Sequence, residues 1–281
     1  MSARSLPGTI VRLPIGLWTF GERHRDASLR PLSGAEEEAI GDASRWPVLA
    51  GRVSALLSLV VTRIGSVSPI ELEHVRALAV LDRDVLMLAL RQQLFGDRVQ
   101  ATIDCPQCGD KIDLDFRLSD LPIPDRASDA PRYEAAIDGQ MIAYRLPNGG
   151  DQEAAAVWIG SDPERAERTI LQRCVEQLDR LSPDQITALR DEMARRDPQL
   201  IDEFDAHCPE CGGDFNVHFD IQDFLLREIA TASAQLYRQV HTLAWYYHWS
   251  EAEILAMPLR KRRIYLDLLA DTIDELTEAR A

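Results

Sequence analysis

The sequence has no long apolar run and no excess of positive charge, and each absence excludes a class of protein. A bilayer-spanning helix needs about 20 nearly uninterrupted apolar residues, whereas the best runs, Leu56–Val61 and Val85–Leu90, are far shorter. No membrane span is expected, and Pro7 and Pro14 argue against a cleaved secretory signal. With 46 acidic against 31 basic residues the net charge is −15, which disfavours nucleic acid as a partner because lysine and arginine supply most phosphate binding.

The sequence also lacks the motifs of common catalytic sites. It contains no GxSxG elbow, Walker-type phosphate loop, GxGxxG, HExxH or kinase signature. Only six histidines are present, and none lies at a spacing that indicates a metal or acid–base group. Carboxylates are so numerous that the pairs Asp82/Asp84 and Asp113/Asp115 are interpreted as solvated faces or charges at a helix corner. No enzymatic activity is expected.

Helical periodicity dominates the chain, whose composition, 46% hydrophobic and 27% charged, is that of a globular protein. Apolar residues recur at three- and four-residue steps between Val48 and Ile64 and between Leu72 and Leu94, which predicts amphipathic helices. The charged run Asp82–Asp84 suggests that the second stretch is two helices meeting at a corner. Further helices are predicted over residues 151–159, 162–178, 182–195 and 224–245, and in two pieces after Ser250 that separate near Pro258.

Short strands are predicted where apolar and polar residues alternate with a period of two. They cover residues 99–103, 111–116, 133–137, 140–146 and 214–219. Asp138-Gly139 is a strong hairpin signal between two of them. Residues 1–32, rich in glycine, proline and arginine, are expected to form an arm in which residues 11–15 are a short strand awaiting a partner.

Four of the five cysteines form one motif that occurs twice, Cys105-Pro-Gln-Cys108-Gly and Cys208-Pro-Glu-Cys211-Gly. In such a knuckle the proline constrains the turn and the glycine permits a tight backbone. Two knuckles supply four thiolates, which is the ligand set of tetrahedral structural zinc. The sequence therefore predicts one zinc ion bound by Cys105, Cys108, Cys208 and Cys211.

The spacing of the knuckles predicts a split zinc ribbon, because 99 residues lie between Cys108 and Cys208. Four thiolates leave no open position for water or substrate, so the metal would be structural. Redox dithiols or two disulfides are the alternatives. His207 and His218 are taken as non-ligands, and Cys174 as a small core residue. The predicted fold class is α+β, mainly α, with helical domains around a small split zinc-ribbon β module.

An aromatic cluster and a basic run near the C-terminus indicate a protein-binding surface. Residues 245–249 are almost all aromatic and residues 260–263 are all basic, and aromatic residues and arginine dominate binding hot spots. The alternatives are that the aromatics pin the last helices to the zinc ribbon and that the basic run is a solvated face. The candidate partner-binding residues are Trp245, Tyr246, Trp249, Arg262, Arg263 and Tyr265.

Several segments resemble the baseplate proteins of T-even-like contractile tails, a family that also occurs in phage-derived contractile injection systems. The similar segments are Leu29–Glu38, Leu81–Asp84, Leu88–Arg91, Gly96-Asp97 with the knuckle that follows, Arg145–Ala154, Leu243–Glu251, Ile254-Leu255 and Arg262–Leu266. The resemblance implies a non-enzymatic structural component or assembly factor that contacts other baseplate or tail proteins. It also implies a place in the cytoplasm during assembly and, for a permanent subunit, in the contractile particle.

The expected organisation follows the order of these features along the chain. The expected parts are an arm (1–32), a helical region (33–96), a split zinc ribbon with β-hairpins (97–150 and 205–222), an inserted helical region (151–204) and a C-terminal helical tail (223–281). The alternative function is a zinc-ribbon regulator that binds nucleic acid, which the carboxylates around the knuckles disfavour. A zinc enzyme would require one knuckle cysteine to be free of metal.

Overall fold

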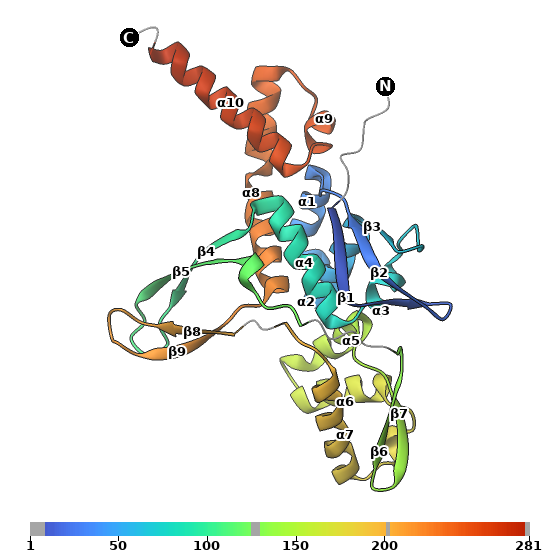
Figure 1. Cartoon of the computed structure of the whole chain (residues 1–281). Coiled ribbons are helices and arrows are strands. Elements are labelled where there is room, and N and C mark those ends of the chain that lie inside the picture. The colour runs from blue at the N-terminus through green and yellow to red at the C-terminus, as the bar shows by residue number, and fades with distance from the viewer. Residues whose placement is uncertain (1–8, 125–129, 201–202, 279–281) are drawn as a thin grey trace.

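The computed structural model describes residues 9–124, 130–200 and 203–278 of the chain. The predicted class, mainly α with small sheets, is confirmed (Figure 1). No helix in these ranges is long and apolar enough to cross a membrane. The elements in chain order are β1 (Thr9–Thr19), β2 (Glu22–Leu29), α1 (Gly34–Gly41), η1 (Ala43–Arg45), α2 (Leu49–Val60), β3 (Val61–Ile64), α3 (Leu72–Ala77), α4 (Val80–Phe95), β4 (Arg98–Asp104), β5 (Lys111–Arg117), η2 (Leu118–Asp120), β6 (Tyr133–Ile137), β7 (Gln140–Tyr144), α5 (Gly149–Ile159), α6 (Pro163–Cys174), η3 (Leu178–Arg180), α7 (Pro183–Arg196), β8 (Glu203–His207), β9 (Asp214–His218), α8 (Ile221–Tyr247), α9 (Glu251–Leu255) and α10 (Leu259–Glu278).

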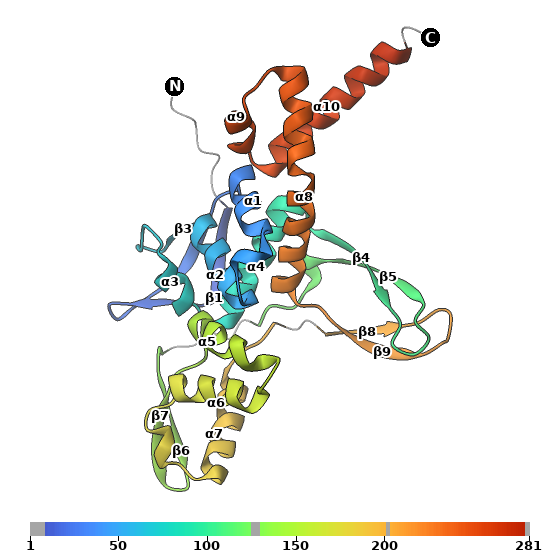
Figure 2. The same cartoon turned by 180° about the vertical axis from the view of Figure 1, so that it is seen from behind.

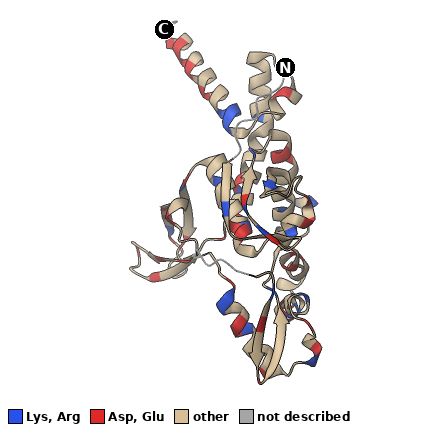
Figure 3. Cartoon of the chain, turned by 45° about the vertical axis from the view of Figure 1, so that its right-hand side comes forward, with Lys and Arg blue, Asp and Glu red and all other residues tan. Residues whose placement is uncertain are grey.

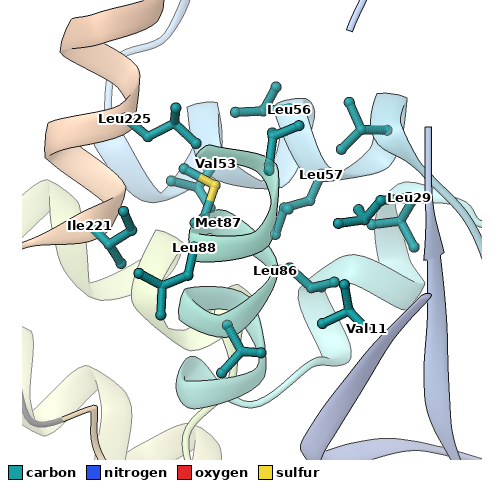
Figure 4. Close-up of a cluster of buried hydrophobic side chains, with 14 of the residues drawn as sticks. Val11, Leu29, Val53, Leu56, Leu57, Leu86, Met87, Leu88, Ile221 and Leu225 are labelled. Atoms are coloured by element: carbon teal, nitrogen blue, oxygen red, sulfur yellow. The ribbon is translucent and has the colours of Figure 1, made fainter. Parts of the chain in front are cut away.

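The main core surrounds α4. On one side lies an antiparallel sheet of order β1-β2-β3, and on the other lie α2 and the start of α8. Val11 and Leu29 of the sheet, Leu57 of α2 and Leu225 of α8 share one buried cluster with Met87 of α4 (Figure 4). Burying such a side chain contributes about 1.5–3 kcal/mol, so this cluster fixes the framework from which the other parts extend.

The N-terminal residues differ from the expected arm. Residues 9–29 form a hairpin, and β3 pairs with β2 through Ala27 and Ile64. Leu13 and Leu17 are 0% and 2% exposed and belong to the main core. A register shift between Arg12 and Leu17 buries consecutive residues of β1, so the sequence shows no clear alternation there and the length of the strand was not predicted.

Two predicted boundaries in the N-terminal helices are also wrong. The helix expected to reach Ile64 ends at Val60, because the β-branched run Val60–Thr62 favours an extended strand. The corner expected at Asp82–Asp84 lies instead between α3 and α4, ahead of Val80. The charged residues lie within α4, and Asp82 is 0% exposed.

A second cluster forms a lobe below the main core, where α5, α6 and α7 lie near the β6–β7 hairpin (Figure 1). Ile142 and Tyr144 of the hairpin pack with Leu171 of α6 and Leu189 of α7. The hairpin predicted around Asp138-Gly139 therefore exists, but it packs with the inserted helices and not with the cysteine hairpins to which it was assigned. Helix α5 contacts α2 and α3 and so attaches the lobe to the main core.

The long helix α8 connects the main core to a third cluster at the other end of the molecule. Its first turns pack on α4, and its second half contributes Leu236, Val240 and Leu243, which pack with Ile254 of α9. The separation of the last two helices near Pro258 is confirmed. Helix α10 begins against α8 and then extends away from the body, as both views show (Figures 1 and 2).

Candidate metal centre

Two β-hairpins project together from the side of the main core and carry the cysteine knuckles at their tips (Figure 1). Strand β4 pairs with β5 in continuous register from Arg98↔Arg117 to Asp104↔Lys111. Strand β8 pairs with β9 in the same manner. Strand β8 was not predicted from the sequence, although Phe204 and Ala206 alternate with polar neighbours.

The two knuckles have the same backbone geometry. In the first, the N–H of Cys105 donates to the carbonyl of Asp110 at 2.8 Å, and the N–H of Gly109 donates to the carbonyl of Cys105 at 2.9 Å. The second knuckle repeats both bonds at 2.9 Å. Gly109 and Gly212 have φ values of 80° and 72°, which glycine adopts without strain. The repeated CPxCG sequence thus produces one turn twice.

The four sulfur atoms form a compact cluster although the pairs lie far apart in the chain. All four Sγ atoms lie within 4.8 Å of one another. The Sγ atoms of Cys105 and Cys211 are 3.8 Å apart, and those of Cys108 and Cys208 are 3.7 Å apart. A disulfide has an S–S distance of about 2.05 Å, so these cysteines are unbonded. A tetrahedron with Zn–S bonds of about 2.3 Å has edges of about 3.8 Å, and the cluster therefore fits one tetrahedral metal ion.

The knuckles approach each other closely at Gly213 of the second knuckle. A Cβ on Gly213 would lie 2.1 Å from the side-chain Oε1 of Gln107 in the first knuckle. The Nε2 of Gln107 donates to the carbonyl of Asp214 at 3.4 Å. Beneath these contacts Cys105 and Cys208 are buried, 3% and 0% exposed, in a small apolar cluster of their own.

Hydrogen bonds and neighbouring thiols shift the pKa values of the two cysteines of the first knuckle in opposite directions. Hydrogen bonds from backbone N–H groups, that of Cys108 foremost, lower the pKa of Cys105 to about 6. A backbone hydrogen bond at Asp110 acts in the same direction on Cys108, but burial and the neighbouring thiols outweigh it and raise the pKa of Cys108 to about 12. Four thiolates so close together would repel one another, and a divalent cation would compensate for their charge.

The surroundings of the centre are acidic. Residues 97–117 and 203–220 contain ten carboxylates and three lysine or arginine side chains. His207 pairs with Asp214 at 2.8 Å and lies outside the sulfur cluster. Four phenylalanines attach the two hairpins to each other and to α8, with ring centroids 5.0–5.1 Å apart between successive members; they are Phe204, Phe116, Phe219 and Phe224.

The predicted partner-binding aromatics do not form one surface. Trp245 and Tyr246 are 69% and 50% exposed. The ring of Trp249 instead stacks on that of Tyr247, with the ring centroids 4.7 Å apart. The ring of Tyr265 meets that of Trp249 edge-on, with the centroids 4.8 Å apart. These rings pin α10 to the end of α8, and not to the cysteine hairpins as the alternative proposed.

Arg262 is removed from the candidate surface because it is 0% exposed. Its guanidinium forms a buried ion pair with Glu37 of α1 and donates to the carbonyl of Met257 at 2.6 Å. The basic run suggested a solvated face, but position 262 lies on the buried side of α10. Arg263 is exposed, and its guanidinium carbon lies 5.4 Å from the ring centroid of Phe95.

Sequence reasoning missed a set of buried charges that hold the elements together. Arg83 donates to the carbonyl of Ala50 at 3.0 Å and to the hydroxyl of Ser54 at 2.9 Å. Asp151, at the start of α5, forms ion pairs with Arg145 and with Arg173. The sequence signal that could have indicated these buried charges was a charged residue within an apolar helical periodicity. Several of these residues lie in the segments that carry the family resemblance.

The described ranges thus form a mainly helical scaffold with one cluster suited to a structural metal. A sequence model of the family described as "T4 bacteriophage base plate protein" matches residues 68–226, which is more than half of the chain. The chain belongs to this family, as the resemblance implied. The matched range contains both knuckles, and it ends within the first turns of α8. No curated protein and no solved structure matches the chain.

Proposed function

We propose that the chain is a non-enzymatic component or assembly factor of a contractile-tail baseplate, in a phage or in a phage-derived injection system. One zinc ion bound by Cys105, Cys108, Cys208 and Cys211 clamps its two hairpins. Family membership supports the baseplate role. The inter-knuckle sulfur distances of 3.7 and 3.8 Å, which match the edges of a zinc–thiolate tetrahedron, carry the metal assignment.

The clamp has a mechanical consequence because of where the hairpins lie in the chain. In the sequence, the lobe of α5, α6 and α7 lies between the first hairpin, β4–β5, and the second, β8–β9. A metal that joins the knuckles holds both ends of this insertion, and it offsets the loop-closure entropy of joining segments about 100 residues apart. All four coordination positions belong to sulfur, so the zinc has no open position for substrate.

The acidic hairpins favour protein partners over nucleic acid. Ten carboxylates around the centre repel phosphate. Salt-sensitive DNA binding by the isolated protein would support the nucleic-acid alternative instead. The same charges suit a basic surface on a neighbouring tail protein.

Co-assembly tests the proposed role. The zinc-loaded full-length chain is expressed with the other baseplate and tail proteins of its system and isolated through them. We expect it to co-purify, and we expect Cys208→Ser to reduce this while Cys174→Ala, which changes the cysteine outside the cluster, does not. A chain that associates with none of the baseplate and tail proteins would contradict the proposal. The protein composition of mature particles then separates a permanent subunit from an assembly factor.

A further inference from the structure

The charge distribution of α10 opposes its own helix dipole. A helix is stabilised by acidic residues in its first turn and basic residues in its last, and α10 has neither. The start of α10, residues 260–263, is basic and is called its base here. The outer half of the helix is acidic, as Figure 3 shows. Charges near a helix end that face the wrong pole weaken an isolated helix by about 0.3–1 kcal/mol each. The arrangement therefore indicates a contact outside the helix itself.

One exposed face of α10 combines these charges with apolar residues. Lys261, Ile264, Leu268, Asp271 and Glu275 follow one another at three- and four-residue steps and so lie on one side of the helix. Ile264 and Leu268 are 49% and 52% exposed. Within the described ranges, the charged residues of this face form no ion pair. The opposite side of α10 packs against α8.

The base and the tip of α10 carry further complementary features. An open groove of about 710 Å³ lies beside the base, and its lining includes Ala89, Leu94, Pro258 and Ile264. At the tip, Ile273 and Leu276 are 37% and 55% exposed. The groove and the tip are about 18 Å apart along the helix, at 1.5 Å per residue, so they cannot cover each other within one chain.

We propose that this face of α10 binds α10 of a second copy of the chain in antiparallel orientation. The acidic tip of each helix then lies beside the basic base of the other. In the register set by the three- and four-residue steps, Ile264 faces Leu268 of the second copy, and Lys261 faces Asp271 of the second copy. A twofold axis repeats each pair. A parallel pair would align like charges, which is unfavourable.

The tips extend this interface to the rest of the molecule. In the antiparallel arrangement the apolar tip of one copy approaches the groove beside the base of α10 in the other. Both exposed apolar features are then covered by the same contact. The proposal uses none of the cysteines and does not depend on the metal assignment, so the two can fail separately.

Oligomeric state tests the proposal on the full-length, zinc-loaded protein by sedimentation over a wide concentration range. We expect a monomer–dimer equilibrium that weakens as salt is added. Lys261→Asp and Asp271→Lys should each raise the dimer dissociation constant by about tenfold or more, because each places like charges opposite each other. The double variant should restore dimerisation, since both pairs re-form with reversed sign.

Two controls separate this interface from a folding defect or another contact. The altered side chains are exposed and each reversal favours the helix dipole, so the thermal midpoint of each variant, compared at a concentration at which both proteins are monomeric, should not fall below that of the parent. Ile159→Ser, which changes an exposed isoleucine on α5, should leave the dimer intact, whereas Leu268→Ser should weaken it. A chain that stays monomeric at every concentration, or a dimer that tolerates both single charge reversals, would overturn the proposal.

Discussion

Buried charges connect elements that lie far apart in the sequence. The carboxylate of Asp82 in α4 accepts hydrogen bonds from the backbone N–H groups of Ile15 and Gly16 in β1, at 2.8 and 2.7 Å. Burial nevertheless raises the pKa of Asp82 to about 6. At neutral pH the ionised group is therefore stabilised by these two donors and by the charges of Arg23 and Arg25. Arg262 plays a similar part between α10 and Glu37 in α1.

Replacement of Asp82 by asparagine tests this connection at the residue scale. The amide offers one acceptor oxygen where two N–H groups need one each, and its NH₂ group would face a donor. We expect the free energy of unfolding in urea to fall by about 1–3 kcal/mol. Asp191→Asn, at an exposed position of α7, should change it by less than about 0.5 kcal/mol. Equal stability of the two variants would show that the bonds to β1 contribute nothing.

At the scale of elements, Gly149 lies where α5 approaches a buried arginine of the main core. A Cβ at this position of α5 would lie 2.1 Å from the guanidinium of Arg83, and Arg83 is 0% exposed and held by α2. A Cβ on the neighbouring Gly150 would have the side-chain Oδ1 of Asn148 as its nearest neighbour, at 3.4 Å. The two glycines thus differ in packing although both lie in the first turn of α5.

These glycines provide a matched pair of variants. Gly149→Ala should lower the free energy of unfolding by about 1–3 kcal/mol, because the buried guanidinium would have to shift from its hydrogen bonds to Ala50 and Ser54. Gly150→Ala should be neutral or stabilising, since alanine is the better helix former. Thermal unfolding of both variants is the measurement. A similar response from the two would contradict the proposed contact between α5 and Arg83.

Elements with a local signal could be predicted from the sequence, and those shaped by distant contacts could not. The β6–β7 hairpin was predicted closely because Asp138-Gly139 fixes its turn. The four cysteines came together as expected because CPxCG occurs twice. The burial of Arg262 depends on Glu37, 225 residues away, and the pairing of sulfurs between knuckles depends on how the hairpins approach. No local pattern records either contact.

At the scale of the whole molecule, the cysteine cluster joins segments on either side of a large insertion. The hairpins are held to the core by phenylalanine contacts, but their own apolar cluster is small, with Cys105, Ile112 and Cys208 as its buried members. So little buried apolar surface stabilises them weakly. Metal coordination, with an apparent free energy of about 10–16 kcal/mol in small zinc modules, is therefore the interaction that would fix their positions.

The most direct test of the account is the zinc content of the freshly purified chain, measured by elemental analysis together with thiol titration before and after chelation. The account predicts one zinc per chain and four thiols that become reactive together when the metal is removed. Cys208→Ser should lose the zinc and Cys174→Ala should retain it. A chain without metal, with four freely reactive thiols in the knuckles, would contradict the account.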